Sequence, residues 1–130
     1  MRDSSEKIPR PTEAELELLQ VLWSSGSLTV RQIHEALPKE TGYTTTLKIL
    51  QKMTDKGLVV RDESQRSHVY SAAVAADRTQ RQLVQHLVRS AFGGSPARLV
   101  MHALSDQKAS ADELREIRRL LRQLEQEGSD

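Results

Sequence analysis

Histidines and carboxylates are the residues of this 130-residue chain that would first suggest catalysis. His34 and Glu35 begin a spacing similar to the zinc-protease motif HExxH, but Pro38 stands at the second histidine position, where it provides no ligand and breaks the helix. The four histidines lack metal-ligand spacing, and no acidic pair suggests general acid–base catalysis. With no cysteine there is no thiolate site, disulfide or cysteine nucleophile. We therefore predict no enzyme, no metal and no cofactor.

Cations and hydroxyl groups in the middle of the chain suggest contacts to DNA instead. Phosphate contacts need cations on exposed or protruding elements, and base contacts need polar side chains on a helix that enters the major groove. The same side chains also have a simpler interpretation as helix caps and solvated charges, which the sequence leaves open. The candidate DNA-binding residues are Tyr43, Thr44, Thr45, Lys48, Lys52, Arg61, Arg66 and His68.

These candidates require a helix and a hairpin to position them. Thr46, Ile49, Leu50 and Met53 follow the spacing i, i+3, i+4 and i+7, which predicts an amphipathic helix whose first free amides are capped by threonines. Gly57 follows its last turn.

Two short β-rich stretches follow this helix. Residues 58–61 and 68–71 are predicted to pair as a hairpin with Arg66 near its tip. A helix followed by such a ribbon is the ending of a winged helix-turn-helix, in which the helix lies in the major groove and the hairpin, or wing, touches the neighbouring DNA backbone.

Two helices are predicted before this unit. Thr12 with Glu15 and Thr29 with Gln32 both match the capping box, in which two side chains satisfy free backbone amides reciprocally. Residues 27–29 are predicted as a short strand that pairs with the wing. The apolar positions expected to face inward are Leu16, Leu19, Leu22 and Trp23 in the first helix and Val30, Ile33 and Leu37 in the second.

The second half of the chain is predicted to hold three more helices. Asp77, Ser95 and Ser110 are their expected N-caps, and Glu113 completes a third capping box with Ser110. The apolar stripes of these helices are too narrow to enclose a core, so we expect a symmetric partner to cover them. The candidate dimerisation residues are Leu83, Leu87, Val88, Leu99, Leu114, Ile117, Leu121 and Leu124.

Overall composition limits the choice of function less than these patterns do. The formal net charge is +1, and residues 1–76 hold ten basic and ten acidic side chains, so bulk charge gives no support for nucleic-acid binding. No apolar run has the length that spans a bilayer, and the charged N-terminus lacks the apolar segment of a signal peptide. We therefore expect a cytoplasmic protein with no evident small-molecule ligand.

Several motifs along the chain resemble those of the penicillinase-repressor family, the winged-helix regulators of the BlaI, MecI and CopY type. They extend over nearly the whole chain, from about residue 9 to residue 124. The matching stretches are residues 12–16, Leu22-Trp23, residues 43–46 with Leu50 and Met53, residues 56–59, Val69-Tyr70 and residues 92–96.

This resemblance implies a homodimer that binds an inverted-repeat operator and represses transcription. It also implies induction by a membrane sensor metalloprotease that cleaves the dimerisation domain. The corresponding bond lies between His102 and Ala103, which do not match the asparagine and phenylalanine of the family's scissile bond. The copper-responsive branch carries a Cys-x-Cys tail, and the absence of cysteine here excludes that route of copper sensing.

The sequence therefore predicts a mainly α-helical protein. Residues 1–11 are expected to be a flexible N-terminus, residues 12–72 a winged helix with a small antiparallel β wing, and residues 73–130 a helical dimerisation domain. The predicted function is a homodimeric DNA-binding repressor whose partners are an operator duplex and a second copy of the chain. A winged-helix protein-interaction module without sequence-specific DNA binding remains the alternative.

Overall fold

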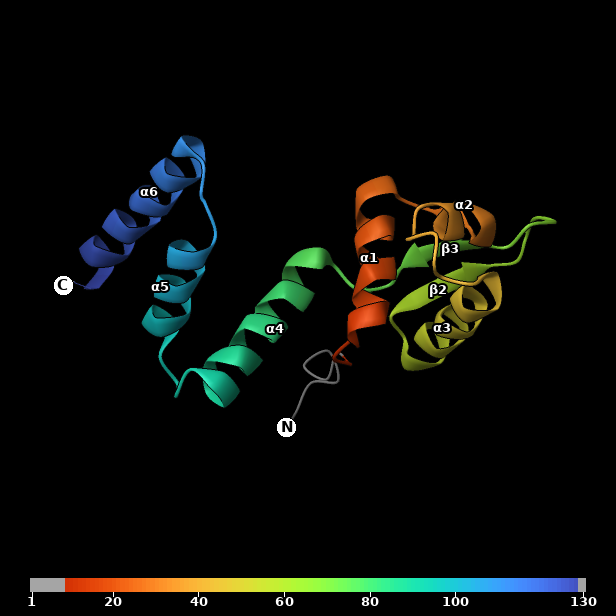
Figure 1. Cartoon of the computed structure of the whole chain (residues 1–130), viewed down its shortest axis with the longest axis horizontal. Helices are drawn as coiled ribbons and strands as arrows, with labels where there is room; N and C mark the ends of the chain where they lie inside the picture. The colour runs from red at the N-terminus through yellow and green to blue at the C-terminus, as the bar shows by residue number, and fades with distance from the viewer. Residues whose placement is uncertain (1–8, 129–130) are drawn as a thin grey trace. The chain divides into compact units, whose positions relative to one another are not determined.

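The computed structural model describes residues 9–128, so most of the predicted flexible N-terminus lies outside the described residues. Within them the chain is mainly helical with a three-stranded antiparallel sheet, which confirms the predicted fold class (Figure 1). The chain divides into two compact units, the first ending at Val84 and the second beginning at Gln85. The elements are α1 (Glu13–Ser25), β1 (Leu28–Thr29), α2 (Val30–Glu35), α3 (Tyr43–Lys56), β2 (Val59–Asp62), β3 (Val69–Ala72), α4 (Ala76–Ala91), α5 (Pro96–Asp106) and α6 (Ala111–Gly128).

Helix α1 begins at the predicted capping box. The Glu15 amide donates to Thr12 Oγ1 over 3.2 Å, and the Thr12 amide donates to Glu15 Oε1 over 2.8 Å. The buried stripe differs from the prediction, because Leu18 is buried beside Leu19 and Leu22 whereas Leu16 is only half-buried. Helix α1 packs on both α2 and α3, so it buries a broader face than the single stripe that the sequence predicted.

Helix α3 starts in a different way from the prediction. Its N-cap is Gly42, which has no side chain to cap the helix, so the predicted threonine caps are wrong. Thr46, the first residue of the predicted inward stripe, is fully buried one turn into the helix, where its hydroxyl donates to the Gly42 carbonyl over 3.3 Å. Gly57 ends the helix as predicted, with a φ of 83° that side chains rarely adopt.

Helix α2 is shorter than its apolar pattern suggested. The predicted capping box of Thr29 and Gln32 is present, and both of its hydrogen bonds form. The helix ends at Glu35, and a tighter turn brings Leu37 into the core before Pro38. Burial of Leu37 therefore did not require the helix to reach it.

The sheet has the order β1-β3-β2, so the predicted short strand does pair with the wing. Leu28 pairs with Tyr70, and Thr29 pairs with Val69. Strands β2 and β3 each begin one residue later than predicted. The hydroxyl groups of Ser27, just before β1, and Ser71, on β3, lie 2.8 Å apart and form a hydrogen bond between these neighbouring strands.

The core of the first unit lies between the three helices and the sheet. Trp23 packs against it half-buried, and its indole Nε1 donates to the Val74 carbonyl over 3.0 Å, so the first unit includes residues that follow the wing. The buried hydrophobic residues are Leu18, Leu19, Leu22, Ile33, Leu37, Leu50, Met53, Leu58, Val59 and Tyr70.

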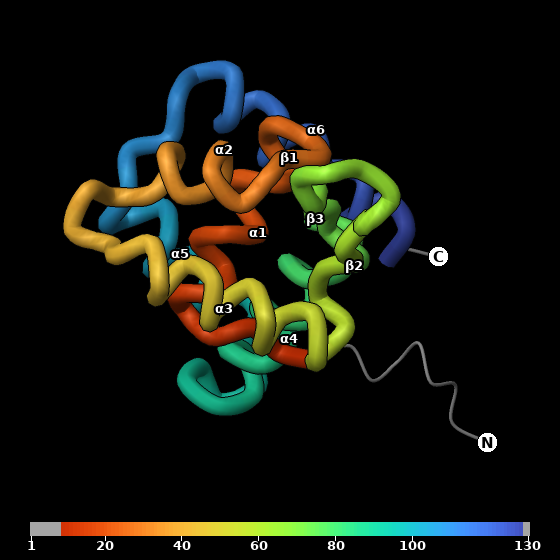
Figure 2. Tube along the Cα trace, turned by 90° about the vertical axis from the view of Figure 1, so that its right-hand side faces the viewer, coloured from red at the N-terminus to blue at the C-terminus, as the bar shows by residue number. Residues whose placement is uncertain are grey.

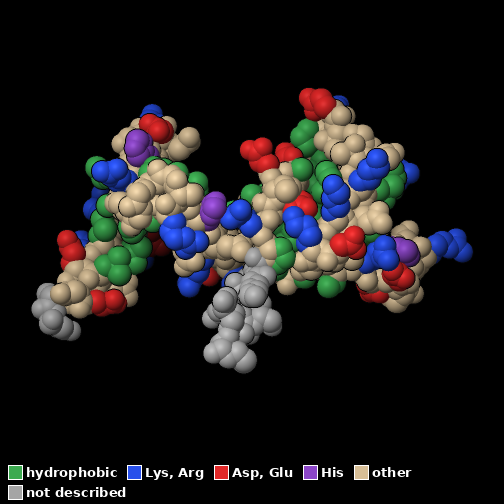
Figure 3. All heavy atoms as spheres, turned by 90° about the horizontal axis from the view of Figure 1, so that it is seen from below, with side chains coloured by type: hydrophobic (Ala, Val, Ile, Leu, Met, Phe, Trp, Pro, Cys, Tyr) green, Lys and Arg blue, Asp and Glu red, His purple; other side chains and the backbone are tan. Residues whose placement is uncertain are grey.

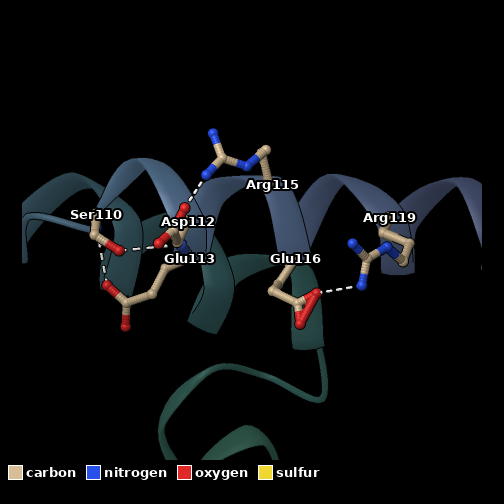
Figure 4. Close-up of polar contacts among 6 residues, drawn as sticks. All are labelled: Ser110, Asp112, Glu113, Arg115, Glu116 and Arg119. Atoms are coloured by element: carbon tan, nitrogen blue, oxygen red, sulfur yellow. Dashed lines mark hydrogen bonds and ion pairs between the residues drawn. The ribbon is translucent and has the colours of Figure 1, made fainter.

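The second unit, described by itself, has no comparable core. Within the described residues, helices α5 and α6 contain no buried side chain. Ser95 caps α5 by accepting from the Arg98 amide. Ser110 forms the predicted capping box with Glu113, and Figure 4 shows it together with the ion pairs Asp112–Arg115 and Glu116–Arg119. These polar contacts stabilise α6 locally and leave its apolar stripe uncovered.

Asp77 does not have its predicted role as an N-cap. Helix α4 begins at Ala76, the residue before Asp77, which places Asp77 inside the first turn. There its carboxylate pairs with Arg81 at 3.1 Å, one turn later on the helix. An acidic side chain in the first turn still complements the positive end of the helix dipole.

Candidate nucleic-acid interface

Helix α3 presents two faces of opposite character. Thr46, Leu50 and Met53 are fully buried and attach the helix to the core. The other face is polar and exposed, and it carries the predicted candidates Tyr43, Thr44, Thr45, Lys48 and Lys52. Polar side chains on a rigidly anchored helix are suited to contact base edges in a major groove.

Two more side chains of this exposed face were not among the predicted candidates. Leu47 is 40% exposed, and Gln51 is also exposed one turn later. A glutamine amide can pair with adenine, and an apolar group can contact the methyl group of thymine. Leu47 follows Thr44 and Gln51 follows Lys48 by three residues, and this spacing on one helix face was the signal that could have found them.

His34 on α2 holds the start of α3 in place. Its Nδ1 atom lies 3.0 Å from the hydroxyl of Thr46, and its ring meets the Tyr43 ring edge-on with the centroids 5.3 Å apart. His34 is therefore a positioning residue for α3, and it has no neighbouring ligands that would make it a metal site. Within residues 9–128, no group of three or more histidine or acidic side chains is arranged to bind a metal ion.

Three candidates lie on the wing, and they differ in whether an acidic side chain pairs with them. Arg61 forms an ion pair with Glu63 at 2.5 Å, and hydrogen bonds with Tyr70 and Glu63 raise the pKa of its guanidinium above the ordinary value. Arg66 and His68 are exposed and form no ion pair or hydrogen bond with any residue that the structure describes. The cation of Arg61 is thus partly neutralised, whereas that of Arg66 is available to an anion.

The turn of the wing has its own local brace. The Ser64 amide donates to Asp62 Oδ1 over 2.9 Å, and this hydrogen bond lowers the pKa of the Asp62 carboxyl group. An aspartate that accepts from the amide two residues later is a common way to start a turn. It shapes the segment that ends in Arg66.

Arg66 and His68 lie in a cleft with Tyr43. The cleft has a volume of about 350 Å³ and is formed by the wing, the start of α2 and the start of α3. In Figure 2, the turn between β2 and β3 lies beside β1 and α2. We call this hollow the wing cleft. Its lining residues are Thr29, Val30, Arg31, Tyr43, Arg66, Ser67 and His68.

Three of the eight predicted DNA-binding residues, Tyr43, Arg66 and His68, line the wing cleft. Arg31, which the sequence analysis missed, lines it as well. The other five lie outside it, four on α3 and Arg61 on β2. Figure 3 shows basic side chains over the end of the first unit that holds α3 and the wing, with acidic side chains among them.

None of the predicted dimerisation residues is fully buried in the single chain. Leu87, Leu114, Leu121 and Leu124 are exposed, and the other four are half-buried. Leu120 is also 54% exposed, although the predicted stripe on α6 omitted it.

The predicted cleavage region lies inside a helix. His102 and Ala103 are exposed residues of α5, and the centroid of the His102 ring lies 5.7 Å from that of the Phe92 ring.

Among the described residues, no helix is both long and apolar enough to cross a membrane.

Comparison with known proteins shows similarity along almost the full chain. Residues 11–123 match a family model described as penicillinase repressor. The transcriptional regulator BlaI of Mycobacterium tuberculosis is 32% identical over 123 residues, which cover 92% of this chain and 88% of that protein. The penicillinase repressor of Bacillus licheniformis is 22% identical over 117 residues, covering 88% and 91% of the two chains. A MarR family protein from Bacillus stearothermophilus, 21% identical with a TM-score of 0.50 over 94% of this chain and 78% of that one, shares the fold.

Proposed function

The chain belongs to the penicillinase-repressor family, as its sequence motifs predicted, and on that basis we propose that it is a transcriptional repressor that binds DNA through its winged helix. The family is one of regulators and not of enzymes. The observation that carries the proposal is the exposed polar face of α3, because its opposite face is anchored in the core by Thr46, Leu50 and Met53.

The residues of α3 and the wing divide between two kinds of contact. Thr44, Thr45 and Lys48 enter the major groove, with Tyr43 and Lys52 at its margin. Arg66 and His68 hold the backbone beside it, and Arg61 contributes less because Glu63 already pairs with it. Residues 12–72 thus supply the DNA-binding domain.

The rest of the chain, residues 73–130, makes the repressor a homodimer. Helices α5 and α6 bury no side chain of their own, and Leu121 and Leu124 are each 52% exposed. Stripes of this kind are stabilised by burial against a second copy. A two-fold dimer presents two recognition helices, so the operator that it fits is an inverted repeat.

Repression ends when the link between the two DNA-binding domains is cut. One recognition helix makes few base contacts, and tight binding depends on the effective concentration that the dimer provides. The proposed inducer is a membrane sensor metalloprotease that acts on the second unit of this cytoplasmic protein. Because His102 and Ala103 are helical, the protease must unfold α5 locally to cleave between them.

Salt-dependent DNA binding tests the proposal. Duplexes are selected from a random pool with the full-length protein and titrated at about 50 and 200 mM salt, where loss of phosphate contacts lowers affinity steeply. An enriched inverted repeat with a steep salt slope supports the repressor. Failure to enrich any sequence, with no salt dependence, supports a protein-interaction module instead.

A further inference from the structure

We propose that the wing cleft is a phosphate site, in which Arg31 of α2 and Arg66 of the wing hold the same DNA phosphate group. This inference rests on the proposed DNA binding and adds to it a residue and a site. Arg31 is outside α3 and the wing, so the pattern of a recognition helix followed by a ribbon did not point to it.

The charges of the cleft are uncompensated. Arg31, Arg66 and His68 form no ion pair or hydrogen bond with any residue in the range 9–128. Two other cations of the first unit, Arg61 and Lys56, are by contrast paired with Glu63 and Glu15. Two unpaired guanidinium groups in one cleft repel each other, and an anion between them removes that repulsion.

The lining of the cleft also identifies the chemistry of its ligand. It contains two arginines, a histidine, a phenol and the hydroxyl-bearing residues Thr29 and Ser67, and no acidic residue is among the lining residues. A second hollow of the same unit, between α1 and α3, has a similar volume of about 320 Å³ but contains Glu17 and Glu40 and no cation. Forked guanidinium donors match the oxygen atoms of phosphate well, so the first hollow is suited to an anion and the second is not.

The sheet holds the two sides of the cleft at a fixed spacing. Thr29 of β1 pairs with Val69 of β3. Arg31 comes two residues after Thr29, and His68 comes directly before Val69. The capping box of Thr29 and Gln32 fixes the start of α2 that carries Arg31. Such an arrangement loses little conformational freedom on binding.

The source of the phosphate is indicated by Tyr43. It lines the cleft and is also the first residue of α3, whose exposed face is proposed to read bases. A phosphate held there belongs to the backbone at the edge of the groove that α3 enters, and it would set the register of the helix. Free phosphate has the same chemistry and is the competing ligand to test.

The test compares full-length variants on a duplex that the parent protein selects. Arg31→Ala is expected to weaken binding at least about fivefold on matched and mismatched sequences alike, and to lower the salt slope by up to about 0.9 per protomer, because Arg66 still contacts the phosphate. Arg31→Lys, which keeps a cation, should retain most of the slope. The matched control is Arg81→Ala, which removes the same charge from an exposed ion pair on α4 and should leave binding unchanged.

A double-mutant cycle tests whether the two arginines share one phosphate. If they do, Arg31→Ala with Arg66→Ala should lose clearly less affinity than the product of the two single losses. A simple product shows separate phosphates and overturns the shared site. Both positions are exposed, so the substitutions should leave the fold intact, and the circular dichroism spectrum of each variant checks this.

Three further outcomes separate this inference from the proposed function. Arg31→Ala binding with the affinity and slope of the parent overturns the cleft while leaving DNA binding intact. A parent protein without salt-dependent DNA binding overturns the proposed function itself. Inorganic phosphate alone, saturating NMR shifts of the cleft residues below about 1 mM at constant ionic strength, overturns DNA as the source of the phosphate.

Discussion

Lys56 Nζ lies 2.7 Å from Glu15 Oε1, and this ion pair joins the last turn of α3 to the first turn of α1. The Glu15 side chain is 5% exposed and that of Lys56 is 34% exposed. Glu15 also accepts the Thr12 amide, so one carboxylate both caps α1 and binds the end of the candidate recognition helix. The pair is therefore a link between folding of the core and the placement of α3.

Removal of the lysine should destabilise the first unit. Burial by itself raises the pKa of the Glu15 carboxyl group, but hydrogen bonds from Lys56 and Thr12 outweigh it and hold that pKa below its ordinary value of 4.5. Lys56→Met should lower the free energy of unfolding by about 1–2 kcal/mol at pH 7, less than for a fully buried pair because Lys56 keeps contact with solvent.

The pH dependence of this effect has a definite sign. A lowered folded-state pKa stabilises the protein above pH 4.5, and that stability is lost as the pH falls through the folded value. Urea unfolding at a series of pH values should therefore show the difference between parent and Lys56→Met shrinking in acid. A difference that stays constant down to pH 3 would contradict an electrostatic role.

Lys48 should contact the operator from one turn inside α3. If it contacts a base, Lys48→Ala should relax discrimination at one position by about 1–3 kcal/mol, whereas loss of a phosphate contact should weaken all sequences alike. Titration of single-base variants of the selected duplex distinguishes these results, with Arg81→Ala as the control for charge. Unchanged binding to every duplex would remove Lys48 from the interface.

Arg66 and Glu63 should have opposite effects on affinity. Arg66→Ala should lower affinity with little change in sequence preference, because the wing positions the backbone. Glu63→Gln should raise affinity, since it removes an anion and frees Arg61 from its ion pair. Fluorescence anisotropy at low salt measures both, and a loss of sequence preference in Arg66→Ala without loss of non-specific affinity would refute the backbone role.

Leu121 should hold the two chains together. Leu121→Asp places a carboxylate in the proposed dimer core, where desolvation is costly, so the protein should shift towards monomer. Operator affinity should fall in step, because two tethered half-sites no longer act together. Sedimentation and operator binding are measured on the same samples, with Arg119→Ala on the same helix as the control.

The DNA-binding domain should stay folded in the Leu121→Asp variant, because Leu121 lies in the second unit. A variant that remains dimeric, or one that is monomeric and still binds the full operator as tightly as the parent, contradicts the proposed architecture.

Local features of this protein were determined by the sequence alone. The capping boxes of Thr12, Thr29 and Ser110 all form, because each depends on residues three positions apart on one chain. Gly57 ends α3 for a similar reason, since only the backbone of one residue is involved. Helix order and the presence of a wing follow from such signals together with apolar spacing, and the family was recognised from the resemblance of its motifs.

Which side chains contact one another in the folded chain was decided only by the tertiary structure. The stripe predicted from the sequence already placed Thr46 towards the core, but its hydroxyl partner there, His34 Nδ1 at 3.0 Å, lies twelve residues away and was not predicted. Arg61 is paired with Glu63 while Arg66 is not, although both read alike as wing cations. Arg31 and Arg66, 35 positions apart, line one cleft because β1 pairs with β3, and strand register depends on which side chains the assembled core can bury.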